Sequence, residues 1–192
     1  TAPLQAPVAI ASDSSFYLLS GTQKISKYSL FSWWKHKITV PYWSSSTGGV
    51  HSASPVIDEK RKRLYLASMD NQIYGIGMAA GIQKWSSNLG GSGIHPGVVI
   101  TEKYLAQPNK LGDIIYFDLD ASISFKEMSP LGKTIFDDGL LGALSLTRDN
   151  ELVAAFASGT IRKWSPNLSS GSIDQIKWET DLATTFQTTP VI

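Results

Sequence analysis

Short runs in which apolar and polar residues alternate dominate the hydrophobic pattern of this chain. The alternation is clearest in residues 63–68 (RLYLAS) and 72–77 (QIYGIG). A period of two places successive side chains on opposite faces of a β-strand. Turn-forming residues such as Gly81 separate the runs. No stretch repeats apolar residues at the spacing of an amphipathic helix over several turns, so the pattern predicts an all-β protein.

The same order of four runs recurs along the chain. One unit opens with SPVI (54–57) and ends at Trp85, and a similar unit ends at Trp178. Successive units open roughly 40 to 50 residues apart, and four strands at such a period are typical of β-propeller blades. We therefore predict one propeller module over residues 1–192, with about four blades of four antiparallel strands each. The expected blades cover about residues 6–42, 54–90, 95–128 and 142–182.

A further repeat begins at residue 188. Residues 188–192 (TTPVI) match the opening of the second unit and are interpreted as the start of a fifth blade. In a closed propeller the last sheet packs against the first. We therefore predict an incomplete, open propeller, whose end blades would expose apolar faces.

The second unit carries the residues that identify the repeat type. Its segments SPVI, LYLAS, DNQIYGIG and GIQKW resemble the pyrroloquinoline-quinone-like (PQQ-like, or quinoprotein-like) repeat, which reads SPV, a strand ending in Gly-Ser or Ala-Ser, DGxLYALD and TGxxxW. The fourth unit is similar through SGTIRKW and IKWETDL. The resemblance implies a β-propeller. The family includes quinone-dependent dehydrogenases as well as non-enzymatic assembly factors and sensor domains.

The WD40 repeat is an alternative. Residues 158–166 (SGTIRKWSP) resemble the DGTIRLWD segment of that family. No Gly-His pair precedes any unit, which favours the PQQ-like repeat. Both alternatives imply a propeller.

An aromatic residue closes each unit in the predicted alignment. A wide, flat ring fills the wedge between neighbouring blades and buries much apolar area. We therefore expect blade-docking roles, with buried side chains, for Trp34, Trp85, Phe125 and Trp178.

Composition excludes several kinds of chemistry. The chain has no cysteine, which excludes disulfides, thiol nucleophiles and Cys-ligated metals. A net charge of +1 argues against a nucleic-acid partner. No apolar run approaches the ~18 residues of a membrane span. No histidine pair or acidic loop has metal-ligand spacing, so no metal site is expected.

One group of candidate ligand-binding residues remains. In a four-stranded blade, the loop between strands two and three emerges on the same side as the link to the next blade. We therefore expect one face near the propeller axis to carry Trp43, His51, Asp70, Asn71 and His95. No catalytic residue can be assigned.

The favoured interpretation is a non-catalytic β-propeller binding or scaffold module without a cofactor, presenting loops to a protein or carbohydrate partner. The partner could also be the missing blades of the same chain or a second copy. The alternatives are a fragment of a PQQ-dependent dehydrogenase, which would bind PQQ with Ca²⁺, and a WD40-like scaffold. For the compartment, which the sequence does not name, the interpretation leans towards a periplasmic or secreted location.

Overall fold

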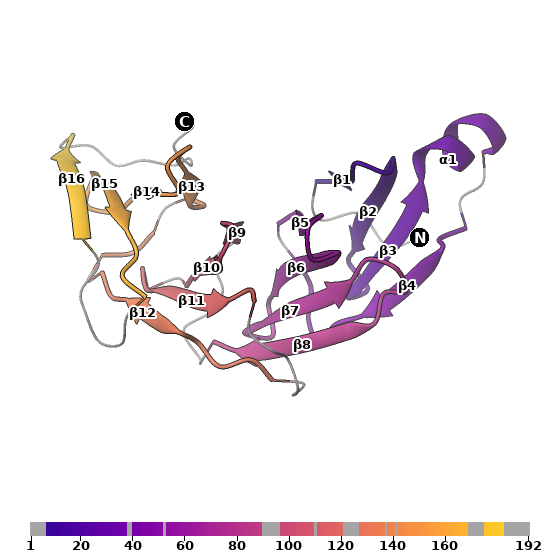
Figure 1. Cartoon of the computed structure of the whole chain (residues 1–192), viewed down its shortest axis with the longest axis horizontal. Helices are drawn as coiled ribbons and strands as arrows, with labels where there is room; N and C mark the ends of the chain where they lie inside the picture. The colour runs from indigo at the N-terminus through magenta and orange to yellow at the C-terminus, as the bar shows by residue number, and fades with distance from the viewer. Residues whose placement is uncertain are drawn as a thin grey trace. The chain divides into compact units, whose positions relative to one another are not determined.

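The computed structural model covers the whole chain. The structure describes residues 7–37, 40–51, 53–89, 97–109, 111–120, 127–136, 138–140, 142–168 and 175–182. Within these ranges the strands form four antiparallel sheets of four strands each. We call them blades 1 to 4 in chain order (Figure 1).

In each blade, strands adjacent in sequence are adjacent in space. Blade 1 consists of β1 (Ala9–Ile10), β2 (Ser15–Ser20), β3 (Lys24–Ser29) and β4 (Trp43–Ser46), and blade 2 of β5 (Val56–Asp58), β6 (Arg63–Ser68), β7 (Gln72–Gly77) and β8 (Gln83–Asn88). Blade 3 consists of β9 (Val99–Ile100), β10 (Tyr104–Pro108), β11 (Ile114–Asp118) and β12 (Gly132–Thr134), and blade 4 of β13 (Ser145–Leu146), β14 (Leu152–Ala155), β15 (Thr160–Ser165) and β16 (Gln175–Asp181). These four meanders confirm the predicted all-β propeller architecture.

The chain divides into two compact units. Unit 1 comprises Thr1–Asn88 with Ile123–Met128, and unit 2 comprises Leu89–Ser122 with Ser129–Ile192. Blades 1 and 2 therefore belong to unit 1, and blades 3 and 4 belong to unit 2. Each unit has its own buried apolar cluster.

The cluster of unit 1 lies between blades 1 and 2. Alternate residues of β2, β6 and β7 belong to it, and so does Ile25 of β3. Its fully buried members include Tyr17, Leu19 and Ile25 from blade 1 and Leu64 and Leu66 from blade 2. The period-two pattern that predicted the strands therefore also provides the apolar faces that hold the blades together.

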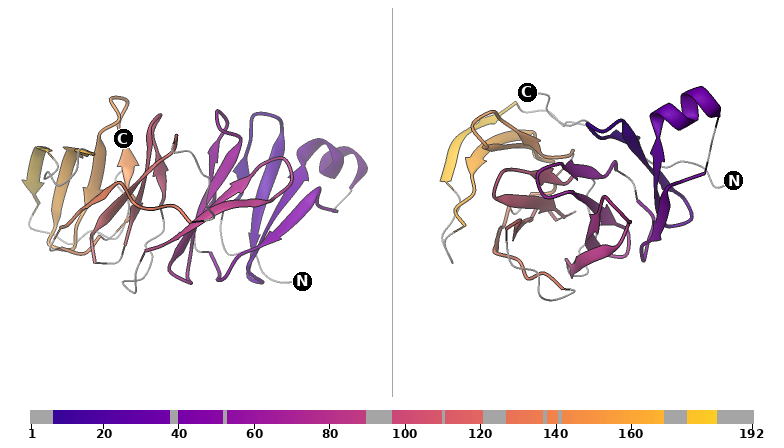
Figure 2. Two further views of the ribbon diagram at one scale, coloured as in Figure 1. Left: turned by 60° about the horizontal axis from the view of Figure 1, so that its bottom comes forward. Right: turned by 45° about the vertical axis from the view of Figure 1, so that its right-hand side comes forward.

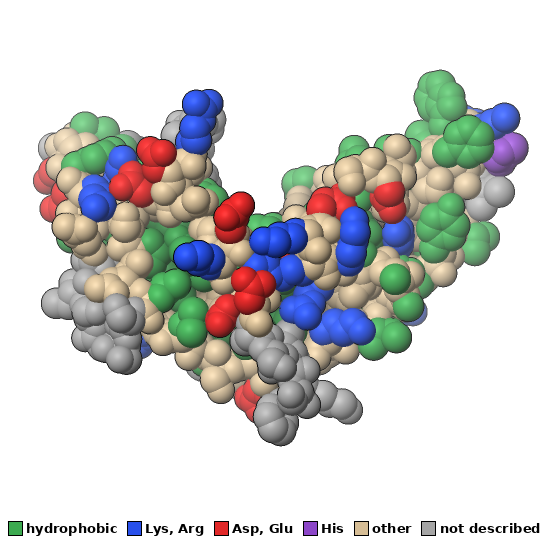
Figure 3. Space-filling view, in the orientation of Figure 1, with side chains coloured by type: hydrophobic (Ala, Val, Ile, Leu, Met, Phe, Trp, Pro, Cys, Tyr) green, Lys and Arg blue, Asp and Glu red, His purple; other side chains and the backbone are tan. Residues whose placement is uncertain are grey.

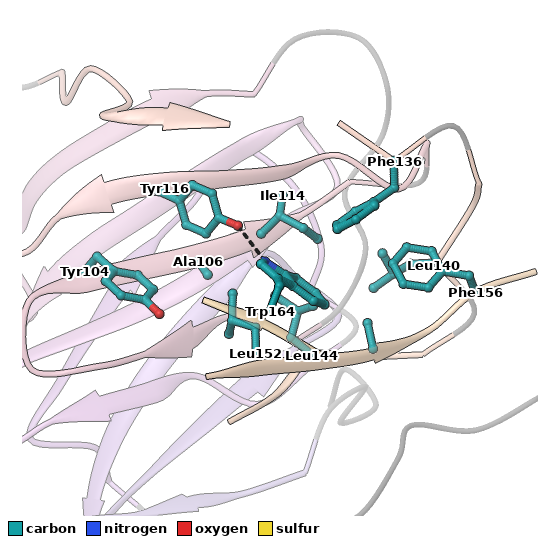
Figure 4. Close-up of a cluster of buried hydrophobic side chains, with 11 residues drawn as sticks. Tyr104, Ala106, Ile114, Tyr116, Phe136, Leu140, Leu144, Leu152, Phe156 and Trp164 are labelled. Carbon is teal, nitrogen blue, oxygen red and sulfur yellow. Dashed lines mark hydrogen bonds between the residues drawn. The ribbon is translucent and has the colours of Figure 1, made fainter. Parts of the chain in front are cut away.

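The cluster of unit 2 is centred on Trp164 in β15 (Figure 4). The indole is fully buried, and its Nε1–H donates a hydrogen bond of 3.1 Å to the hydroxyl of Tyr116 in blade 3. The Phe136 ring lies 5.1 Å from the Trp164 ring, centroid to centroid, in an edge-to-face arrangement. Trp164 is thus the docking aromatic residue of unit 2, a role that was not predicted for it from the sequence.

Trp178 does not have the buried position expected for it. It lies on β16, the last strand of blade 4, and 43% of its surface remains exposed. Every described residue of β16 is exposed. Trp85 in β8, by contrast, is fully buried and packs against Tyr65 with ring centroids 5.8 Å apart.

Blade 3 ends later in the sequence than predicted. Its fourth strand is β12, beyond the expected limit of residue 128. Glu127, expected in blade 3, instead pairs in parallel with Ser86 of β8, and the Met128 N–H donates a 3.0 Å hydrogen bond to the Ser86 carbonyl. Phe125 lies outside the described residues, and the aromatic residue that follows β12 is Phe136.

The α-helix α1 (Leu30–His36) interrupts blade 1 between β3 and β4, and the views of Figure 2 show it beside the sheet. The Ser29 hydroxyl caps it by accepting a 3.2 Å hydrogen bond from the Ser32 N–H, and Lys37 ends it in the left-handed conformation. The strand expected around Trp34 is therefore a helix, and Trp34 is 74% exposed. It does not dock blades.

Two further predictions are not tested by the described residues. The start of a fifth blade falls on residues 188–192, which are not described, and the open arrangement of the propeller stays a prediction.

Within the described ranges, no helix combines the length and the apolar character needed to cross a bilayer.

Candidate functional site

His51 lies in the link between blades 1 and 2 and is buried, with only 2% of its surface exposed. Its Nδ1 is 2.9 Å from the Ala67 carbonyl, and its Nε2 is 2.6 Å from the Thr47 hydroxyl. These distances fit a neutral ring in which Nδ1–H donates to the carbonyl and Nε2 accepts from the hydroxyl. Burial lowers the pKa of His51 below 6.5, and the hydrogen bond to Ala67 and the charge of Asp70 oppose that shift.

We expect His51 to make folding pH-dependent. Its folded-state pKa is below the unfolded value of 6.5, so at acid pH the unfolded chain binds a proton that the folded chain resists. The free energy of unfolding is therefore expected to fall as the pH drops below about 6.5. Urea titrations from pH ~7 to ~5 should show a smaller loss for His51→Gln than for wild type. Equal losses would contradict this role.

Asp70 and Asn71 form the hairpin between β6 and β7, next to the His51 link. Asp70 accepts hydrogen bonds from the Gln72 N–H (3.2 Å) and the Tyr74 hydroxyl (2.5 Å), and the Gly48 N–H donates to the same hydroxyl (3.0 Å). Burial and the bond to Asp70 raise the pKa of Tyr74 to about 12. Asn71 adopts a φ of 63°, as tight hairpins require. The Tyr74 hydroxyl therefore connects Gly48 in the link to Asp70 in the hairpin by hydrogen bonds, and these bonds anchor the link to the hairpin.

Gly48 and Gly49 make this close approach possible. A Cβ on Gly48 would lie 2.1 Å from the Asp70 carboxylate, and one on Gly49 would lie 2.7 Å from the Asp70 backbone nitrogen. The structure thus brings His51, Asp70 and Asn71 to the same end of blade 2, where the hydrogen bonds of His51 and Asp70 hold the nearby backbone.

Trp43 lies at the opposite end of blade 2 from this network. Its indole N–H donates a 3.0 Å hydrogen bond to the carbonyl of Met78, and its ring covers Gly81, where a Cβ would come within 2.3 Å. Met78 and Gly81 belong to the turn after β7, whereas Asp70 precedes β7. Trp43 therefore packs between blades 1 and 2, as Trp34 was expected to do. His95 lies outside the described residues.

The described part of unit 1 contains an apolar groove on the face of blade 1 that points away from blade 2. Its volume is about 390 Å³, and its walls are Val8, Phe16, Leu18, Tyr28, Leu30 and Trp33. The rings of Phe16 and Tyr28 stack with centroids 5.2 Å apart. Leu30 and Trp33 come from α1, which walls one side of the groove. Such a concave apolar surface is the kind that takes an apolar ligand or partner.

The groove was not predicted from the sequence, although the pattern of β2 indicates it. Phe16 and Leu18 alternate with Tyr17 and Leu19, so β2 is apolar on both faces. A strand with two apolar faces is typical of a sheet that is covered on both sides. The groove could not be inferred from β2 alone, because its second wall is α1, and no helix was predicted there.

Metal ligands do not gather in the described residues. In that part of the chain, no three His, Asp or Glu side chains are grouped so that they could hold a metal ion.

No family model and no curated protein matches the sequence. Solved structures do match. BamB from Moraxella catarrhalis aligns with a TM-score of 0.69 and 13% identity over 94% of this chain and 49% of its own. The C-terminal WD40 domain of Sif2 aligns with a TM-score of 0.77 and 13% identity over 96% of this chain and 51% of its own.

The comparisons establish a β-propeller fold. At 13% identity the similarity concerns the fold alone, and the chain spans about half the length of both matched chains. Solved structures of this kind are numerous, with 1372 matching chains. The fold therefore does not single out a function.

Proposed function

We propose that this chain is a non-catalytic β-propeller module that binds a protein partner, and that the groove on blade 1 is its docking surface. The observation that carries the proposal is the correspondence between this groove and a face of blade 2 that is already packed.

The correspondence follows from strand register. In blade 1, Phe16 pairs with Tyr28 on the groove face. In blade 2, Leu64 pairs with Ile76 at the same position of its sheet. Leu64 and Ile76 are buried against blade 1 in the cluster of unit 1.

The next positions of the two sheets correspond in the same way. Leu18 in β2 takes the place of Leu66 in β6, which is 1% exposed in the cluster of unit 1. Leu30, after β3, takes the place of Met78, after β7, which is buried in the same cluster. The groove is therefore the blade 1 version of a surface that, in blade 2, is covered by a neighbouring sheet.

This chemistry favours a protein partner over a carbohydrate. The six groove residues present aliphatic and aromatic side chains, and Tyr28 is the only one of them with a side-chain hydroxyl. A sugar requires many hydrogen-bonding groups, whereas apolar side chains with aromatic anchors are enriched at the centre of protein interfaces. The expected partner presents an apolar sheet face or a comparable set of apolar side chains.

The test is the variant Leu18→Asp. A carboxylate in the groove would be buried unpaired on docking, so we expect binding of the partner to weaken by at least about 100-fold. Proteins retained by the immobilised wild-type chain should be lost from Leu18→Asp. They should be kept by Ile82→Asp, the matched control, because Ile82 is an exposed residue in the β7–β8 turn. Retention of the same proteins by both variants would refute the proposed docking surface.

We also propose that the repeat is of the PQQ-like type without a bound quinone, supported by SPVI, LYLAS and GIQKW in the second unit. Its alternative, the PQQ-dependent dehydrogenase, is tested by titrating the chain with PQQ and Ca²⁺. We expect no stoichiometric uptake by absorbance after gel filtration and no dye-linked alcohol oxidation. Uptake of one quinone per chain would replace the proposed function with the enzymatic one.

A further inference from the structure

Large apolar side chains are exposed to solvent on α1 and in the chain segment that follows it. Phe31, Trp34, Val40 and Tyr42 are each between 61% and 74% exposed, and we call these four residues the spur. Figure 3 shows hydrophobic side chains protruding over α1, with basic and histidine side chains beside them. Scattered exposed apolar residues need no explanation, but four in one short segment indicate an interaction surface.

Blade packing does not require the spur. Blade 2 joins its third and fourth strands through residues 78–82, whereas blade 1 uses residues 30–42 and includes a helix. None of the residues of α1 is buried. The insertion therefore presents side chains outwards.

The spur is also distinct from the groove. Leu30 and Trp33, three residues apart on α1, line the groove. Phe31 and Trp34 are also three residues apart and occupy a neighbouring strip of the helix surface, because residues at that spacing share a face. Groove and spur can therefore be altered separately.

The charge around the spur is of one sign. Lys35 and Lys37 lie next to it, and no Asp or Glu occurs between Asp13 and Asp58. The Lys35 Nζ is 5.2 Å from the centre of the Phe31 ring, and the Lys37 Nζ is 5.5 Å from the centre of the Trp34 ring. Aromatic rings and cations are therefore mixed at one surface. An anionic partner complements that surface.

We propose that the spur anchors this protein peripherally to a lipid bilayer that carries anionic headgroups. Tryptophan and tyrosine rings favour the headgroup level of a bilayer, where an apolar ring body and a polar edge are both satisfied. Lysine side chains extend their ammonium groups to lipid phosphates while their methylene stems lie along the apolar layer. A short helix with no buried residue can insert without disturbing the core of blade 1.

The test is co-sedimentation of the full chain with vesicles of phosphatidylcholine and phosphatidylglycerol in equal parts. We expect binding to these vesicles and at least about tenfold weaker binding to pure phosphatidylcholine, because both spur-adjacent lysines would lose anionic partners. The double variant Phe31→Ser/Trp34→Ser should lose at least about tenfold in partitioning, since two large apolar side chains no longer insert. Lys35→Gln/Lys37→Gln should lose affinity for the anionic vesicles alone.

Two matched controls separate the spur from other apolar surfaces. Ile82→Ser removes an exposed apolar side chain elsewhere in unit 1 and should bind vesicles like wild type. Leu18→Asp alters the groove and should also bind vesicles normally, so failure of the proposed function and failure of this inference are distinguishable. Circular dichroism of each variant verifies that it is folded. No binding by the folded wild-type chain, or binding that Phe31→Ser/Trp34→Ser leaves unchanged, would overturn the proposal.

Discussion

Replacing Trp164 by alanine is expected to lower the free energy of unfolding by about 3–5 kcal/mol. The indole is fully buried between blades 3 and 4, in contact with the ring of Phe136 and hydrogen-bonded to Tyr116. Truncation would remove the apolar contacts of the ring and leave a cavity that rigid neighbouring sheets cannot fill. Urea denaturation followed by circular dichroism measures the change.

Trp178→Ala is the matched control for this substitution, in the same blade and with the same change of side chain. Because Trp178 is 43% exposed on the last strand, its truncation is expected to cost about 1 kcal/mol or less. Two variants with equal losses would show that Trp164 does not hold blades 3 and 4 together. The comparison also decides between the docking residue seen in the structure and the one that the sequence pattern favoured.

Gly75→Ala is expected to destabilise unit 1 by about 1–3 kcal/mol, the usual cost of overpacking. Gly75 lies in β7 opposite Trp85, and a Cβ there would lie 2.4 Å from the indole Nε1. The ring is fully buried, so it has little room to move away. The loss should appear as a lower urea midpoint with an unchanged slope.

Gly132→Ala provides the control for a glycine within a strand. A Cβ at Gly132 in β12 meets no atom within 4 Å. Alanine there restricts the unfolded chain without creating a clash, so we expect a change between zero and about 1 kcal/mol of stabilisation. If Gly75→Ala were as well tolerated as Gly132→Ala, the close packing of Trp85 on β7 would be refuted.

The strands could be predicted from the sequence because the residues of each strand alternate between its two faces. The runs 63–68 and 72–77 became β6 and β7 at those bounds. Helix α1 was missed because it has only seven residues and lacks an apolar stripe packed on the core. Its residues Phe31 and Trp34 therefore looked like part of a strand.

Which aromatic residue docks the blades could not be predicted fully from a single sequence. An aligned Trp at the end of a unit predicts a ring on the fourth strand, and Trp85 and Trp178 do lie on β8 and β16. Which ring is buried depends on the face that each neighbour offers, and in blade 4 that ring is Trp164 on the third strand. His51 and Asp70 were expected on one face and do lie together, but only the contacts reveal that they fix the backbone.

The most direct test of protein binding through the groove is site-specific photo-crosslinking. A benzophenone amino acid is placed at Leu18 in the groove and, in a second variant, at Ile82 in the exposed β7–β8 turn. The two proteins are irradiated with the partner retained by the wild-type chain, and the adducts are mapped by mass spectrometry. The account predicts an adduct from position 18 that excess unlabelled wild-type chain abolishes, and none from position 82. Equal adducts from both positions, or an adduct from position 82 alone, would contradict it.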